Sequence, residues 1–336
     1  MNSPAQPISV NALAQGVLRR DRAALGRAIT LVESSKPEHR HLADELLAKL
    51  HPATAQIPSY RIGVTGLPGV GKSTFIDQFG SNLTAEGHRV AVLAVDPTSN
   101  RTGGSLLGDK TRMARLATDP DAFVRPSPAG RTLGGVARKT RETMLLCEAA
   151  GFDVVIVETV GVGQSESAVA GMVDFFLVLL LPGAGDELQG LKRGLIELAD
   201  MIAINKADGD FQGRASATAA DYRAALHILS NRGDGWKPDA VTVSAQENLG
   251  LDHLWSAVKR HRQEAQASGQ LEAKRRAQSV AWMHELIEDR LRGLIRGNAR
   301  IRSRMAALEA EVRAGRKLPA SAADEILAMA GLDRRT

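Results

Sequence analysis

Hydrophobic and polar positions follow a strand-and-helix rhythm through the middle of the chain. From Tyr60 onward, short apolar runs alternate with amphipathic segments, the pattern of a parallel α/β sheet. The predicted strands are Ile62–Thr65, Val90–Val95, Ala122–Val124, Val154–Val157, Val173–Leu181, Met201–Ile204 and Ala240–Val243. Most of them end in polar or glycine-rich residues. Ligands of open α/β sheets bind at the carboxyl ends of strands, so we expect the chemistry at that edge.

Both ends of the chain have helical periodicity instead. The N-terminal apolar positions predict two helices before about residue 59, separated by a break at residues 34–37: Leu13, Val17, Leu25, Ile29 and Val32, then Leu42, Leu46 and Leu50. From about Arg262 the strand pattern stops, and two further helices meet near Gly297 and Asn298. Their apolar positions are Val280, Met283, Ile287, Leu291 and Leu294, then Ile301, Met305, Leu308 and Val312.

These patterns predict three parts: an N-terminal helical extension (1–58), a nucleotide-binding α/β domain (59–262) and a C-terminal helical arm (263–336). The arm has one apolar stripe, which must be buried against something. It packs either on the main domain or on a second copy of the chain, and the sequence leaves both open.

The residues from Gly66 to Ser73, GLPGVGKS, match the phosphate-binding pattern G-x-x-x-x-G-K-[ST]. A predicted strand precedes them and a helix begins near Gly71, so backbone N–H groups and the helix dipole face a phosphate. We expect Lys72 to reach the β- and γ-phosphates and Ser73 to hold Mg²⁺. The predicted nucleotide contacts here are Gly66, Pro68, Gly69, Val70, Gly71, Lys72, Ser73 and Thr74.

Three carboxylates are candidates to bind the metal or to take part in the hydrolytic step. Asp96 follows the strand Val90–Val95 and opens a long glycine-rich loop that also contains Asp109. Either residue could act on Mg²⁺ or water, or could simply cap a helix. Glu158 ends a strand of β-branched residues. We predict Lys72, Asp96 and Glu158 as catalytic, and Ser73, Asp96, Asp109 and Glu158 around the metal.

Glu158 also begins the pattern E-x-x-G, in which the N–H group of Gly161 can sense the γ-phosphate. A loop of this kind orders or collapses with the state of the nucleotide. Gln164 is polar enough to position water, but it lies three places after Gly161, so we assign it no role in hydrolysis.

Two later motifs predict that the base is guanine. Asn205–Asp208 has the pattern N-K-x-D, and the carboxylate of Asp208 can accept from N1–H and from the 2-amino group of guanine. Adenine offers neither donor, so the site would reject ATP by leaving polar groups unpaired. Lys206 would lie over the base. Ser244, Ala245 and Gln246 fit the S-A-x element, whose backbone meets the guanine O6 atom.

A glycine-rich, charged loop from Leu181 to Lys192 also lies at a carboxyl end. It has more polar residues than a connection between a strand and a helix requires. We predict Asp186, Gln189 and Lys192 as a relay between the nucleotide and a partner. The alternative is a plain connection in which Asp186 caps the next helix.

Composition narrows the class of protein. The 336 residues are 43% hydrophobic and 24% charged, as in a globular protein with one large or two modest domains. The sequence predicts no membrane span and no signal peptide, and its single cysteine, Cys147, excludes a disulfide framework. We therefore expect a cytoplasmic protein that does not act at a membrane.

The net charge of +5 does not indicate nucleic acid. Residues 271–317 hold 12 Lys and Arg against 6 Asp and Glu, so the excess of positive charge lies in the C-terminal arm. A charge run of this kind is typical of a solvated helix face. Aromatic residues make up only 4% of the chain, which does not favour the stacking platforms of single-strand binders.

The order of these motifs resembles the MeaB/ArgK/MMAA group of P-loop GTPases, which act as chaperones for metalloenzymes. The resemblance covers almost the whole chain, and its most specific stretches are Val95–Met113, Glu158–Glu166 and Leu181–Lys192. It implies a GTPase that uses GTP/GDP and Mg²⁺, gates the loading of adenosylcobalamin into methylmalonyl-CoA mutase and protects that mutase.

The resemblance further implies a homodimer held by the C-terminal arm and a relay through residues 182–192. We expect hydrolysis to be slow until the partner stimulates it, because no glutamine directly follows Gly161 and no arginine finger is identifiable. A cobalamin adenosyltransferase is a further candidate partner. Competing functions are a kinase or transport-related ATPase, a nickel-delivering GTPase of the same superfamily, and a scaffold that binds GTP without turnover. The predicted recognition of guanine by Asp208 argues against a kinase that uses ATP. The eight scattered histidines and lone cysteine do not favour metal delivery.

Overall fold

The computed structural model describes residues 9–34, 36–54, 59–95, 113–126, 133–159, 165–183, 193–229 and 235–332. The chain divides into two compact units, Met1–Arg276 and Ala277–Thr336. In the described part, no helix combines the length and the apolar character needed to cross a membrane.

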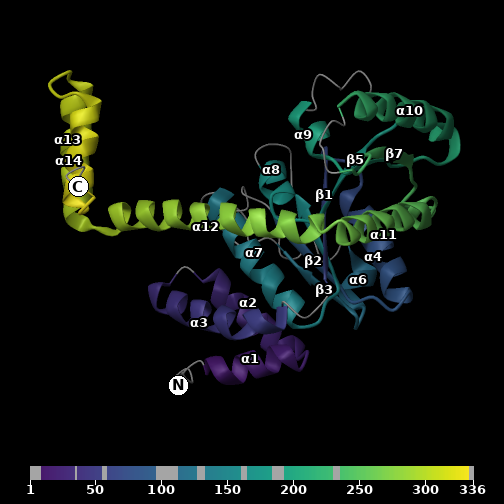
Figure 1. Cartoon of the computed structure of the whole chain (residues 1–336), viewed down its shortest axis with the longest axis horizontal. Helices are drawn as coiled ribbons and strands as arrows, with labels where there is room; N and C mark the ends of the chain where they lie inside the picture. The colour runs from purple at the N-terminus through teal and green to yellow at the C-terminus, as the bar shows by residue number, and fades with distance from the viewer. Residues whose placement is uncertain are drawn as a thin grey trace. The chain divides into compact units, whose positions relative to one another are not determined.

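The first unit is built on a seven-stranded sheet (Figure 1). The strands are β1 (Tyr60–Gly66), β2 (Val90–Val95), β3 (Ala122–Arg125), β4 (Val154–Thr159), β5 (Phe175–Leu180), β6 (Met201–Ile204) and β7 (Asp239–Thr242). Their order is β3-β2-β4-β1-β5-β6-β7, and every neighbouring pair is parallel. The predicted fold class, an α/β protein with a mainly parallel sheet, is confirmed.

Helices cover both faces of this sheet. Among the described residues, the helices between β1 and α12 (Gln270–Gly297) are α4 (Lys72–Ala85), α6 (Ala114–Thr118), α7 (Leu133–Ala149), α8 (Ser165–Ala170), α9 (Arg193–Leu198), α10 (Gln212–Leu229) and α11 (Leu251–Ala267), with a 3₁₀ turn η3 at Gly209–Phe211. One core layer packs under α4, α6 and α11, and the other under α7 to α10 and the N-terminal helices. Because the strands are buried on both faces, their sequences are continuous apolar runs.

The N-terminal extension differs from the prediction of two helices. Residues 9–34 and 36–54 form three: α1 (Val10–Leu18), α2 (Arg22–Glu33) and α3 (Pro37–Thr54). The chain turns at Arg20, whose φ is 65°, and the Asp21 carboxylate then accepts from the N–H groups that open α2. Apolar residues keep the helix period across this turn, because both helices pack on the same core. Periodicity alone therefore did not reveal the break.

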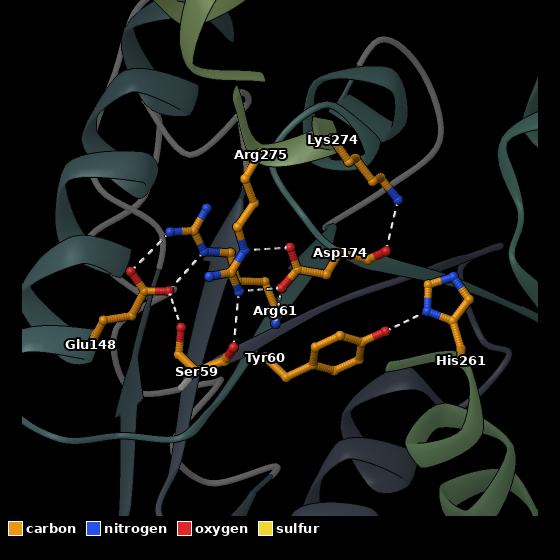
Figure 2. A network of polar contacts seen from close by, with 8 residues as sticks. All are labelled: Ser59, Tyr60, Arg61, Glu148, Asp174, His261, Lys274 and Arg275. Carbon is orange, nitrogen blue, oxygen red and sulfur yellow. Dashed lines mark hydrogen bonds and ion pairs between the residues drawn. The ribbon is translucent and has the colours of Figure 1, made fainter. Parts of the chain in front are cut away.

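A polar network at the amino edge of the sheet fixes the start of α12 (Gln270–Gly297), as Figure 2 shows. Arg275 donates to both carboxylate oxygens of Asp174, at 2.9 and 2.6 Å, and to the carbonyl oxygen of Ser59 at 2.9 Å. Asp174, which is fully buried, also accepts from the Arg61 N–H group. The Arg61 side chain pairs with Glu148 at 2.7 Å. The first turns of α12 therefore belong to the α/β unit.

The second unit contains the rest of α12, then α13 (Ala299–Arg313) and α14 (Pro319–Met329). Gly297 is the last residue of α12, where the sequence predicted the break, and Asn298 caps α13 by accepting from Arg300 N–H. A small core of Ile301, Leu308, Ala322 and Ile326 joins α13 to α14. The α12 stripe remains exposed, at 36–69% for Val280, Met283, Ile287, Leu291 and Leu294.

Candidate nucleotide-binding site

The loop between β1 and α4 has the backbone that a phosphate cradle needs. Gly66 approaches β5 so closely that a Cβ atom would lie 2.4 Å from the carbonyl oxygen of Leu179. Gly69 and Gly71 have φ values of 81° and 92°, which favour glycine. Gly71 is also the N-cap of α4 and supplies no side-chain cap, so the first N–H groups of this 14-residue helix remain available to an anion.

Lys72 is held above this loop. Its ammonium group donates to the carbonyl oxygens of Gly66 at 2.8 Å and Leu67 at 3.3 Å. Burial lowers the pKa of Lys72, while the charges of Glu158 and Glu166 act in the opposite direction. The cation is thus partly desolvated next to the phosphate cradle, where its attraction for phosphate oxygens is strengthened.

Glu158 and Ser73 meet at the start of α4. Glu158 is the penultimate residue of β4 and is 4% exposed; its Oε1 atom accepts from the Ser73 hydroxyl at 3.4 Å. A carboxylate and a hydroxyl beside a phosphate cradle are hard oxygen donors of the kind that Mg²⁺ prefers. The donor set therefore fits the predicted metal, with Ser73 and Glu158 as the described residues that would hold it.

Asn205 connects the phosphate loop to the two base-recognition motifs. Its Nδ2 atom donates to the Val70 carbonyl oxygen at 2.8 Å, and its Oδ1 atom accepts from Ala245 N–H at 3.2 Å. Lys206, with a φ of 59°, donates from Nζ to the Gly69 carbonyl oxygen at 3.1 Å. Segments more than 100 residues apart in the sequence thus form one site at the carboxyl edge of the sheet.

The residues predicted to recognise the base follow the strands β6 and β7. Asp208 follows β6, is half-buried, and makes no cap hydrogen bond to η3. Ser244 is fully buried and exchanges two backbone hydrogen bonds of 3.0 Å with Leu249, which closes the turn after β7. Ala245 is buried and Gln246 is exposed. The turn is held in place independently of any nucleotide.

Several predicted residues lie outside the described part of the chain. These are Asp96 and Asp109 of the first loop, Gly161 and Gln164 of the second, and the three relay residues Asp186, Gln189 and Lys192. Pro68 and Thr74 are described and exposed, one in the phosphate loop and one on α4.

Sequence reasoning missed two features of this site. Glu166, at the start of α8, is 6% exposed and its charge acts on Lys72. The hydroxyl groups of Thr65 and Thr159 form a buried hydrogen bond of 2.7 Å between β1 and β4. Both threonines are adjacent to motif residues near the ends of their strands. This position in the sequence could have indicated that they lie at the site.

A cavity of about 820 Å³ lies at the opposite, amino edge of the sheet, among residues that include Trp236 and His261. Two carboxylates in its wall are tied to the fold. Asp174 pairs with Arg275, and Asp200 lies 3.7 Å from the ammonium group of Lys274. The phosphate and base motifs all lie at the other edge, so this cavity is separate from the nucleotide site.

Comparison with known proteins agrees with this arrangement of motifs. The family model described as methylmalonyl Co-A mutase-associated GTPase MeaB matches residues 25–300. The chain belongs to this family. The resemblance found in the sequence is thereby confirmed, and the chain is a member of a family of guanine-nucleotide hydrolases.

Individual relatives are similar over most of their length. GTPase ArgK of Escherichia coli is 50% identical, with 84% of this chain and 83% of that protein covered. The mitochondrial methylmalonic aciduria type A homolog of Mus musculus is 45% identical, with 95% and 79% covered. A crystal structure described as LAO/AO transport system kinase has a TM-score of 0.74 and 38% identity, and covers 98% and 99% of the two chains.

Proposed function

We propose that this protein is a GTP-hydrolysing chaperone that gates the loading of adenosylcobalamin into methylmalonyl-CoA mutase and protects that mutase. The observation that carries the nucleotide part is Asn205, which joins the phosphate loop to the guanine motif through two hydrogen bonds. The mutase part rests on the family's description and on the name of the mouse relative.

In this proposal the roles divide between the two sides of the site. Lys72 and the N–H groups at the start of α4 bind and orient the phosphates, Ser73 and Glu158 hold Mg²⁺ with Asp96 and Asp109, and Asp208 selects guanine. Mg²⁺, when bound, neutralises phosphate charge. The buried position of Glu158 and the partial burial of Lys72 favour these electrostatic effects, because charges interact more strongly where they are partly removed from water.

We further propose that hydrolysis is slow until the mutase stimulates it. No glutamine directly follows Gly161, so the sequence provides no residue in the usual place to position water. The relay would be Asp186, Gln189 and Lys192, because they follow β5 in the sequence and β5 ends at the carboxyl edge of the sheet, where the phosphate loop lies. Two sites coupled in binding are reciprocal, so the nucleotide must also change the affinity for the mutase.

The test measures GTP hydrolysis with and without the mutase, and capture of the mutase with GDP, GTP and a non-hydrolysable GTP analogue. We expect a low basal rate, stimulation by the mutase, and capture that depends on the nucleotide. Lys192→Ala should keep GTP affinity and basal turnover while losing the stimulation. A rate that the mutase does not change, together with capture that ignores the nucleotide, would overturn the chaperone function but leave the GTPase intact.

A control separates this function from a kinase. ATP should be a poor substrate, and no phosphoryl group should pass from GTP to free amino acids. Transfer to an amino acid would contradict the proposed function.

A further inference from the structure

The hydroxyl groups of Thr65 and Thr159 are the starting point. Their Oγ1 atoms lie 2.7 Å apart, and the two residues are 1% and 0% exposed. Thr65 directly precedes Gly66, the first glycine of the phosphate loop, and Thr159 directly follows Glu158. Since Val64 pairs with Glu158 in the parallel register of β1 and β4, the threonines come one residue further along both strands.

Strand alternation places the Glu158 and Thr159 side chains on opposite faces of the sheet. Ile156 packs in the core layer that contains Phe75 of α4, and Val157 packs in the other layer. Glu158 continues the first series and reaches Ser73 on α4. Thr159 continues the second series and reaches Thr65. The hydroxyl pair therefore holds the end of β4 from the face opposite to the one where Glu158 works.

The same strand end also adjoins β2. Thr159 pairs in register with Val95, the last residue before Asp96. The strands that precede the three segments predicted to act on phosphate or metal thus end close together, at Gly66, Val95 and Thr159. A displacement of the β4 end would move Glu158 relative to the phosphate loop.

We propose that Thr65 and Thr159 are positioning residues: their hydrogen bond fixes the end of β4 against β1, holds Glu158 beside Ser73 and so sets the affinity for Mg²⁺. The proposal rests on the proposed function only in taking Ser73 and Glu158 as the metal's ligands. Partners that orient metal ligands commonly change metal affinity by one to two orders of magnitude when they are removed.

Valine has nearly the shape of threonine without the hydroxyl, which allows the stability effect to be separated from the positioning effect. Thr65→Val or Thr159→Val alone leaves the other hydroxyl buried without its partner, and such a group is costly. The double variant removes both hydroxyls, so no orphan is left and stability should return toward that of the parent. The side-chain hydrogen bond between β1 and β4, however, is lost in all three variants.

The experiment measures, on the full chain, the Mg²⁺ concentration needed for half-maximal binding of a non-hydrolysable GTP analogue, together with the thermal midpoint without nucleotide. We expect the double Val variant to need about tenfold more Mg²⁺ although its thermal midpoint is close to the parent's. The matched control, Thr65→Ser with Thr159→Ser, keeps both hydroxyls and should bind Mg²⁺ as the parent does.

Glu158→Gln separates failure of this inference from failure of the site assignment. If Glu158→Gln raises the Mg²⁺ requirement and the double Val variant does not, the threonine pair is only structural and the inference is overturned. If Glu158→Gln leaves the requirement unchanged, Glu158 is not a metal residue, and the proposed function loses that assignment. A Mg²⁺ requirement that follows the thermal midpoint across all variants would also overturn the positioning role.

Discussion

The side-chain amide of Asn205 donates a hydrogen bond to the main-chain oxygen of Val70, and the two atoms are 2.8 Å apart. Because Asn205 is 2% exposed and also accepts from Ala245 N–H, one side chain joins three loops. The relative position of the predicted phosphate and base subsites therefore depends on Asn205, together with Lys206, which donates to the Gly69 carbonyl oxygen.

Asn205→Ala should weaken GDP and GTP binding by similar factors. The change leaves the buried Ala245 N–H group and the Val70 carbonyl oxygen without this partner, which costs about 1–3 kcal/mol, or about 5- to 150-fold in affinity. Gln246→Ala, an exposed neighbour in the same turn, is the control and should bind nearly normally. Titration with labelled GDP and GTP checks this. Selective loss of one nucleotide would contradict the bridging role.

Asp208→Asn should move the preference from guanine toward xanthine. Xanthine has an oxygen in place of the 2-amino group and requires a donor, which the asparagine amide supplies. GTP binding should fall by several kcal/mol, because polar groups on both sides are left unpaired. Competition between GTP and XTP measures the switch. If the variant retained GTP affinity and gained none for XTP, another residue would select the base.

The binding of GTP should depend on pH through Lys72. Burial lowers the pKa of Lys72 from its ordinary value of 10.5 in the nucleotide-free protein, and nearby phosphates would favour the charged form. At a pH between the pKa of Lys72 in the nucleotide-free protein and its higher pKa in the complex, GTP binding takes up a proton. GTP affinity should therefore fall as the pH rises toward 10.5. In the same window the unfolded chain binds more protons, so the nucleotide-free protein should gain stability.

Calorimetry in buffers of different ionisation enthalpy measures this proton uptake. Lys72→Ala should bind GTP more weakly and without the uptake, and it should lose most of its turnover. Equal proton uptake in the parent and the Lys72→Ala variant would assign the titration to another group.

The central sheet could be predicted from sequence because its strands are buried on both faces. Runs such as Val90–Val95 and Met201–Ile204 have the same limits in the structure as in the prediction. Helix ends were harder to predict where polar contacts decide them. The turn at Arg20 and Asp21 left the apolar period intact, so the sequence predicted one helix where there are two.

In the site, too, local features could be predicted from the sequence and contacts between distant segments could not. Phosphate and guanine motifs are local, and their residues lie together as predicted, with Asn205 as the link. The Thr65–Thr159 hydrogen bond is not local, since it depends on β1 lying beside β4 in one register. No spacing in the sequence encodes that adjacency. The Asp174–Arg275 pair, 101 residues apart, was hidden for the same reason.

Asp174→Ala should destabilise the α/β unit strongly. Asp174 is fully buried and accepts from Arg275 and from the Arg61 N–H group, so its removal takes away the carboxylate that pairs with a partly buried cation. Breaking a buried pair from one side costs about 3–5 kcal/mol. Denaturant unfolding checks the value, with Asp239→Ala as a control, because Asp239 pairs with Arg223 on the exposed surface. Similar losses for the two variants would contradict the importance of burial.

A stop codon after Arg276 should give a folded protein that binds nucleotide, whereas a stop after Arg262 should not. The sequence placed the start of the arm at residue 263, but α11 continues to Ala267, and Arg275 then pairs with Asp174. The shorter protein would lose the end of α11 and the partner of a buried carboxylate. Its thermal midpoint should therefore fall at least as far as that of Asp174→Ala, while residues 1–276 should keep that of the full chain.

The longer truncation also tests the dimer. It lacks the stripe from Val280 to Leu294, which is exposed along α12 and which a second copy would cover if the arm is the dimer interface. Light scattering should then find the full chain as a dimer and residues 1–276 as a monomer with unchanged GDP affinity. Because that truncation keeps Arg275, loss of the dimer would not be a consequence of unfolding. A dimer that persists in residues 1–276 would place the interface on the α/β unit instead.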